Sequence, residues 1–145
     1  MGIVIEPLSR DFVDPVAEIE AECFSVPFTK KDISEYLENG LWQFFVATEN
    51  GQVLGYISFR LVFDECHICN VATATEARRR GVGSLLVDYL ITYAKGQGVS
   101  KYFLEVRESN LPAIELYKKF GFAPVGVSKN HYTKPKENAI LMNLE

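Results

Sequence analysis

The sequence of residues 66–106 predicts, in this order, a strand, a short basic loop with two glycines, an amphipathic helix and a second strand. Two strands that are joined through a helix pair in parallel, and such a crossover is almost always right-handed. Apolar residues recur at helical spacing after the loop, which predicts a helix from about Val82 to Lys95. This unit therefore requires an α/β fold with a parallel strand pair.

The rest of the chain completes a mixed α/β sheet in a single domain over residues 1–145. Asp14 before Pro15 predicts the start of the first helix, and residues 29–32 resemble a capping box for the second. Asn50-Gly51 predicts a tight hairpin. The expected order is β-α-α-β-β-β-α-β-α-β-β, with strands near residues 3–7, 43–49, 53–63, 66–72, 102–106, 123–129 and 139–144, and helices near 14–24, 29–39, 82–95 and 111–120.

Composition and charge restrict the class of protein. The 145 residues are 48% hydrophobic and 23% charged, which is typical of a soluble globular domain. The net charge of −4 argues against general nucleic-acid binding. The first residues, MGIVIEPLSRDF, lack the basic segment and following apolar stretch of a secretion signal. The chain has three cysteines, and an odd number is typical of free thiols in a reducing compartment. We therefore expect a cytoplasmic protein without membrane association.

The pair Cys66 and Cys69, with His67 between them, is the one arrangement that suggests metal or redox chemistry. On an alternating strand Cys66 and Cys69 point to opposite faces, and no second ligand pair occurs elsewhere. We therefore expect no metal site. His67 is either an auxiliary base that faces a substrate or an ordinary polar strand residue.

The loop RRRGVG, residues 78–83, opens the predicted helix. Backbone N–H groups at a helix N-terminus lack partners within the helix and carry partial positive charge, so they favour an anion. Glycines let phosphate oxygens approach the backbone, and arginines add charge-assisted hydrogen bonds. The loop lacks the GxxxxGKS/T and GxGxxG patterns, which excludes a P-loop and a dinucleotide fingerprint. It predicts a phosphate or pyrophosphate site, or simply an exposed turn with solvated arginines.

Several separated stretches give the chain a family resemblance. RRRGVG resembles the Gln/Arg-x-x-Gly-x-Gly/Ala pyrophosphate loop of the GNAT acetyltransferases. LEVRESNLPAIELYKKFGF, residues 104–122, resembles the downstream half of the same superfamily. That stretch is most similar to the branch that acetylates the N-terminal alanine of a ribosomal protein, and VPFT (26–29) and NHYTKPKENAILM (130–142) resemble the same branch. DECHICNVAT (64–73) resembles the strand that precedes the loop. The resemblance covers nearly the whole chain.

The resemblance implies a splayed sheet with acetyl-CoA held between two strands. It implies Glu105 as general base and Tyr117 as general acid. The acceptor would be a protein N-terminus on the side of Phe28, His67, His131 and Tyr132. The residues implied to contact acetyl-CoA are Val71, Ala72, Thr73, Arg79, Arg80, Gly81, Val82, Gly83, Ser84 and Asn110.

These implied roles agree with the chemistry of acyl transfer. The amine must lose a proton, which Glu105 accepts if burial in an apolar strand raises its pKa. The departing thiolate must gain a proton, and a phenol such as Tyr117 is protonated at neutral pH. From the residues alone, Glu105 could instead point outward, Tyr117 could be core, and Asn110 could be only a helix cap.

Four departures from the family pattern concern the loop entry and the acceptor side. Thr73-Ala74-Thr75 stands where Val-x-Pro is usual, and Ala77 stands where an aromatic is frequent. Phe28 replaces a common tryptophan, and His131 replaces a frequent tyrosine. None removes a proposed catalytic group. We expect direct acetyl transfer to a protein N-terminus by a monomer or weak dimer. The alternatives are transfer to a small amine or a non-catalytic acyl-CoA-binding module.

Overall fold

Seven strands form one mixed sheet in the computed structural model, which describes residues 2–145. The strands are β1 (Val4–Pro7), β2 (Gln43–Glu49), β3 (Gln52–Val62), β4 (Glu65–Thr73), β5 (Lys101–Arg107), β6 (Ala123–Tyr132) and β7 (Glu137–Leu144). The helices are α1 (Val13–Cys23), α2 (Lys30–Asn39), α3 (Val82–Gly96) and α4 (Leu111–Lys119). The predicted element order is confirmed, with two added 3-10 turns, η1 (Arg10–Phe12) and η2 (Thr75–Ala77).

The starts of the first two helices test the capping predictions. The prediction that Asp14 caps α1 is wrong, because η1 leads directly into a helix that already begins at Val13. Asp14 lies inside the first turn instead, where its negative charge interacts favourably with the positive end of the helix dipole. The capping box of α2 is confirmed: the Thr29 hydroxyl accepts from Asp32 N–H (3.1 Å), and the Asp32 carboxylate accepts from Thr29 N–H (2.9 Å).

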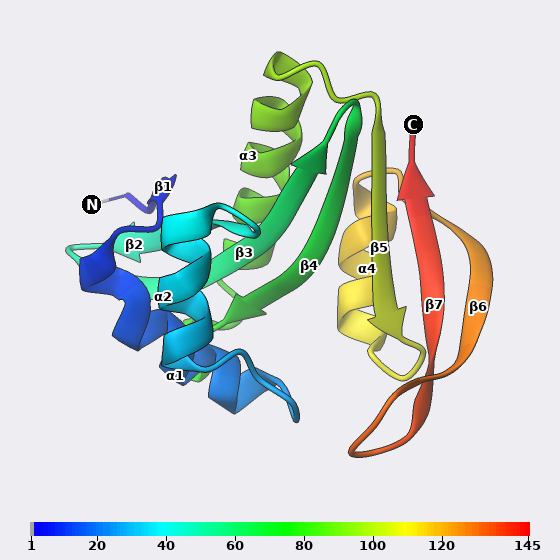
Figure 1. The fold of residues 1–145 in the computed structure, drawn as a ribbon, viewed down its shortest axis with the longest axis horizontal. Helices are drawn as coiled ribbons and strands as arrows, with labels where there is room; N and C mark the ends of the chain where they lie inside the picture. Colours follow the sequence, from blue (N-terminus) through cyan, green and yellow to red (C-terminus); the bar gives the residue numbers. More distant parts are fainter. Residues whose placement is uncertain (1) are drawn as a thin grey trace.

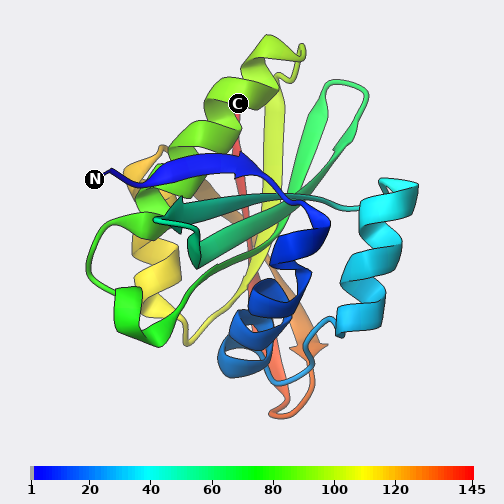
Figure 2. The ribbon, with the colours of Figure 1, turned by 90° about the vertical axis from the view of Figure 1, so that its left-hand side faces the viewer.

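Helices cover both faces of the sheet (Figures 1 and 2). The Tyr56 hydroxyl of β3 donates to Glu20 of α1 on one face. On the other face Phe45 of β2 packs edge-on against Tyr89 and Tyr93 of α3. Each central strand therefore carries apolar side chains on both sides, and β2 and β3 are buried almost throughout. No helix within residues 2–145 is long and apolar enough to span a membrane.

The parallel pair predicted by the crossover unit is β4 with β5, and it is short. The two strands pair only from Glu65–Ile68 to Lys101–Leu104. Beyond these four pairs, β4 continues along β3, while β5 continues along β7. Figure 1 shows the two strands moving apart toward the lower part of the sheet. The sheet is thus split in its middle, with two strand edges facing each other without mutual hydrogen bonds.

A β-bulge lies at the point where the strands part. Ser58 of β3 pairs with Asn70, and Phe59 pairs with Ile68, so that Cys69 is the extra residue on β4. Bulges bend the strand that carries them and increase its twist. Ile68 is also the last residue of β4 that pairs with β5. The bulge at Cys69 therefore turns β4 away from β5.

A buried carboxyl group fixes the loop between α1 and α2. Glu20 is only 1% exposed. Its oxygens accept hydrogen bonds from the Tyr56 hydroxyl, from Asn70 Nδ2 (3.0 and 3.2 Å) and from Phe28 N–H (2.9 Å). Glu20 thus joins α1 to the sheet just beyond the bulge and holds the backbone of the loop at Phe28.

Gly55 lets the start of α3 lie close to the sheet. A Cβ at this position would stand 2.6 Å from the Ala72 carbonyl oxygen and 2.9 Å from Val82 Cγ1. Real Cβ atoms do not approach backbone so closely, and the carbonyl belongs to a paired strand that cannot withdraw. Only glycine therefore fits between β4 and α3 here.

We predict that Gly55→Ala lowers the free energy of unfolding by about 2 kcal/mol or more, because the added methyl group overpacks a rigid contact. Thermal unfolding should show a melting temperature several degrees lower. Gly96→Ala is the matched control, because its Cβ would meet no atom within 4 Å and alanine favours helix. Equal melting temperatures for the two variants would contradict the argument.

We predict that Glu20→Gln lowers the free energy of unfolding by about 2–3 kcal/mol. In glutamine an NH2 group replaces one of the two carboxylate oxygens. The Tyr56 hydroxyl, Asn70 Nδ2 and Phe28 N–H all donate to these oxygens, so at least one of them loses its acceptor. Urea unfolding measures the loss, with Glu18→Gln as the control, since Glu18 is an exposed residue of the same helix. An unchanged midpoint for Glu20→Gln would show that the network does not stabilise the fold.

Candidate active site between the parted strands

A cavity of about 490 Å³ opens where β4 and β5 separate. One wall comes from the end of α1, the loop that follows it, and the bulged part of β4. The opposite wall comes from β5, α4 and the loop between β6 and β7. The lining residues are Cys23, Phe24, Ser25, Val26, Cys69, Asn70, Val71, Glu105, Val106, Arg107, Asn110, Ala113, Tyr117, His131, Tyr132, Thr133 and Pro135.

Glu105 reaches the cavity from β5. The buried residues Leu104 and Val106 point to the opposite face of this strand, so the alternation of β5 directs Glu105 to the face covered by α1 and α2. Its side chain is exposed rather than buried among the apolar residues of the strand. Glu105 is thus a solvent-accessible carboxyl group in the cavity wall.

Tyr117 reaches the same cavity from α4, on the other side of the sheet. It is buried, and its ring packs against Phe122 at 5.8 Å between centroids. Burial raises the pKa of the Tyr117 phenol above its usual value, and the neighbouring Tyr132 and Cys69 raise it further. The hydroxyl is therefore protonated at neutral pH and able to donate. The parting of the strands allows groups from opposite faces to share one cavity.

The free edge of β4 runs along Val71, Ala72 and Thr73. These residues pair with β3 and have no partner on β5. Every second backbone N–H and C=O group of such an edge points into the gap. The segment can therefore hydrogen-bond an extended chain that bears amide groups.

The basic loop ends at the start of α3. The first hydrogen bond of the helix runs from Leu85 N–H to the Gly81 carbonyl (3.1 Å), which leaves the N–H groups of Val82, Gly83 and Ser84 for other partners. Gly81 has a φ of 76°, and Arg79 has a φ of 68°. Such left-handed residues are typical of loops whose N–H groups form an anion-binding concavity.

The charged side chains around this loop have different roles. Arg80 is held by Glu49 through two hydrogen bonds (3.0 and 2.8 Å), and this contact lowers the pKa of the Glu49 carboxyl. Arg80 thus anchors the loop to β2 rather than standing free. Arg79 is exposed. Lys119, which the sequence analysis missed, donates to the Ser84 hydroxyl (2.8 Å) and adds a positive charge beside the helix start.

Asn110 caps α4. Its side-chain oxygen accepts from Ala113 N–H (3.3 Å), and Asn110 also lines the cavity. The helix-cap interpretation therefore applies, and it does not exclude a contact with a ligand in the cavity.

The four residues expected on the acceptor side do not lie together. His131 and Tyr132 line the cavity at the end of β6, so they belong to a strand that runs longer than predicted. Phe28 packs against Tyr36 (5.3 Å between ring centroids) and is not among the residues that line the cavity. His67 stacks on Phe103 (5.3 Å) outside the cavity.

Cys66 and Cys69 lie in different surroundings, as the alternation of the strand predicts. Cys66 is fully buried in the core, whereas Cys69 lines the cavity. Burial raises the pKa of the Cys69 thiol to about 11. Within residues 2–145 no three His, Cys, Asp or Glu side chains gather as metal ligands would.

These features fit acetyl-CoA. Unpaired N–H groups and cations at the start of α3 suit a pyrophosphate, and the free edge of β4 suits an extended arm with amide groups. The cavity beyond that edge holds a protonated phenol and an accessible carboxyl group, which an acyl transfer to an amine requires.

Comparison with known proteins agrees with this geometry. Residues 13–122 match the acetyltransferase (GNAT) family. The chain is 37% identical to the ribosomal protein bS18-alanine N-acetyltransferase of Haemophilus influenzae, over 98% of this chain and 97% of that protein. It is 32% identical to the enzyme of that name from Escherichia coli (strain K12), over 87% and 86%.

Solved structures show the same fold. The crystal structure of the ribosomal-protein-S18-alanine N-acetyltransferase from Escherichia coli superposes with a TM-score of 0.89 at 30% identity, covering 99% of this chain and 93% of that one. The chain therefore belongs to the GNAT acetyltransferase family and is an acetyl-CoA-dependent N-acetyltransferase.

Proposed function

We propose that the chain acetylates the N-terminal α-amine of ribosomal protein bS18, on an N-terminal alanine, in the cytoplasm. The names of its relatives at 37% and 32% identity support this acceptor. The observation that carries the proposal is that the parted strands bring Glu105 and Tyr117 into one cavity beside the free edge of β4. An α-amine also suits a modest base, since its reference pKa is near 8, against about 10.4 for lysine.

The residues of the chain have separate tasks in the proposed reaction. Acetyl-CoA supplies a thioester carbonyl as the electrophile. Glu105 takes a proton from the acceptor amine, directly or through water, as the new C–N bond forms. Tyr117 gives its proton to the sulfur as the C–S bond breaks. A backbone N–H near Val71–Thr73 polarises the carbonyl oxygen.

Transfer is proposed to be direct rather than through a cysteine. Cys69 is within the cavity, but burial raises the pKa of its thiol to about 11. A thiol in that state carries little thiolate at neutral pH and is a poor nucleophile. The amine itself is then the group that attacks.

We predict that Tyr117→Phe lowers kcat about 10²-fold with little change in either KM, because only the proton donor is lost. Steady-state kinetics with acetyl-CoA and an alanine-starting peptide measures this. Tyr89→Phe is the control, since Tyr89 lies on α3 away from the cavity. A kcat for Tyr117→Phe within twofold of the wild-type value would exclude Tyr117 as the acid.

The acceptor is tested with a peptide panel read by mass spectrometry. We predict one added acetyl group on a peptide with the first residues of Escherichia coli bS18 after removal of methionine. The same peptide with a blocked N-terminus and a free lysine should remain unmodified, as should spermidine. Acetylation of spermidine alone would favour a small-amine enzyme, and turnover of peptides regardless of the first residue would contradict the alanine specificity.

A further inference from the structure

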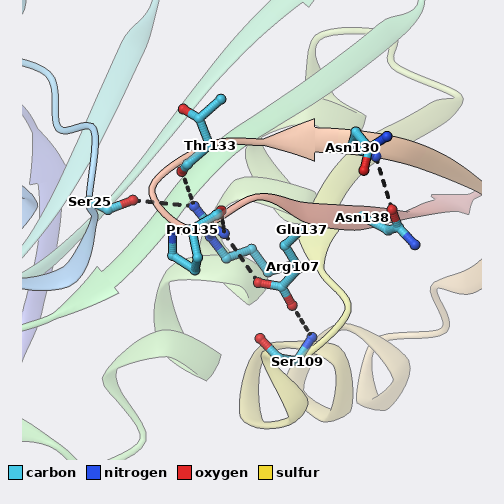
Figure 3. Close-up of polar contacts among 8 residues, drawn as sticks. All are labelled: Ser25, Arg107, Ser109, Asn130, Thr133, Pro135, Glu137 and Asn138. Carbon is cyan, nitrogen blue, oxygen red and sulfur yellow. Dashed lines mark hydrogen bonds and ion pairs between the residues drawn. The ribbon is translucent and has the colours of Figure 1, made fainter.

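Arg107 joins two loops that line the cavity from opposite sides. Its Nη2 donates to the Thr133 carbonyl (3.0 Å) and to the Ser25 hydroxyl (3.2 Å). Its Nη1 donates to the Pro135 carbonyl (2.9 Å) and to Glu137 (3.1 Å). Figure 3 shows the guanidinium between the loop after α1 and the loop that joins β6 to β7. One side chain thus binds four groups on two segments.

The second oxygen of Glu137 extends this bridge toward α4. It accepts from Ser109 N–H (2.8 Å), one residue before the helix cap Asn110. The Ser109 contact lowers the pKa of Glu137, and Arg107 lowers it further, so the pair stays ionised at neutral pH. The guanidinium also lies 4.4 Å from the ring centroid of Tyr132, which lines the cavity. The bridge therefore reaches the β6–β7 loop and the start of α4.

The contact with Ser25 distinguishes this bridge from an ordinary surface ion pair. Among residues 2–145, it is the one side-chain hydrogen bond that connects residues 24–27 with the β5–β7 half of the sheet. The loops that it links carry cavity-lining residues on both sides, Ser25 and Thr133 among them. The bridge therefore connects the two walls of the cavity directly.

We propose that Arg107 is a positioning residue that holds the α1–α2 loop and the β6–β7 loop together and so shapes the acceptor end of the cavity. Arg107 lies two residues beyond Glu105 on β5, on the same face. The groups that surround the start of α3 make no contact with it. Its loss should therefore weaken acceptor binding and leave acetyl-CoA binding intact. The kinetic part of this inference depends on the proposed function.

The test compares Arg107→Gln, Arg107→Lys and Ser25→Ala with the control Arg10→Gln, which removes an arginine from an exposed ion pair with Glu38 (2.9 Å). We expect Arg107→Gln to raise the acceptor KM about tenfold or more, with kcat and the acetyl-CoA KM within about twofold. Arg107→Lys keeps the charge but not the fork of donors, so only part of the affinity should return.

Hydrogen–deuterium exchange gives a readout that does not depend on the acceptor. Amides of residues 133–138 should exchange faster in Arg107→Gln than in wild type and Arg10→Gln. Ser25→Ala should raise the acceptor KM without changing the acetyl-CoA KM. The double variant should have the same acceptor KM as Arg107→Gln, because both substitutions remove the Arg107–Ser25 contact.

Unchanged exchange in Arg107→Gln, or equal increases in both KM values, would overturn the role of Arg107. Failure of the wild-type enzyme to acetylate the bS18 peptide would overturn the proposed acceptor instead. The exchange experiment would then still decide whether Arg107 holds the loops.

Discussion

The bulge at Cys69 is the constraint on which the rest of the site depends. It ends the pairing of β4 with β5 after four residue pairs and turns β4 away. Without it the central sheet would close, the edge along Val71–Thr73 would be paired, and Tyr117 would be sealed beneath the strands. The backbone hydrogen bonds that β4 and β5 do not make with each other are offset by the long pairing of β4 with β3 and of β5 with β7. The course of the backbone therefore creates the gap in which the cavity lies, and side chains from both walls line it.

The electrostatics of the loop are more local than three adjacent arginines suggest. Glu49 neutralises Arg80 and fastens the loop to β2. The positive field at the start of α3 then comes from free N–H groups, the remaining arginines and Lys119. A site built in this way suits a single compact anion on an acidic protein. It differs from the long basic surface that a nucleic acid requires.

Sequence reasoning predicted the elements and their order because capping and turn residues act locally, as Thr29, Asp32 and Asn50-Gly51 show. It failed at Asp14, where a 3-10 turn leads into a helix that begins one residue earlier, at Val13. Neither the bulge nor the Arg107 bridge was predicted, since both depend on register and on loops far apart in sequence. Whether Glu105 is buried was left open from the sequence, and the structure shows it exposed, because its apolar neighbours along β5 point to the opposite face. Lys119 was missed because its partner Ser84 lies 35 residues away.

Gly55 touches no proposed ligand, yet it lies under both the Ala72 carbonyl and Val82, two places where acetyl-CoA is expected to bind. A side chain at this position would displace the β4 edge and the first turn of α3 together. In a saturation mutagenesis screen for acetyl-CoA use, position 55 would therefore score like a contact residue. Substitutions at position 55 would be rejected because they change the spacing between two parts of the cofactor site, and not because residue 55 contacts the cofactor. Redesign of this enzyme for a bulkier acyl donor should accordingly leave residue 55 untouched.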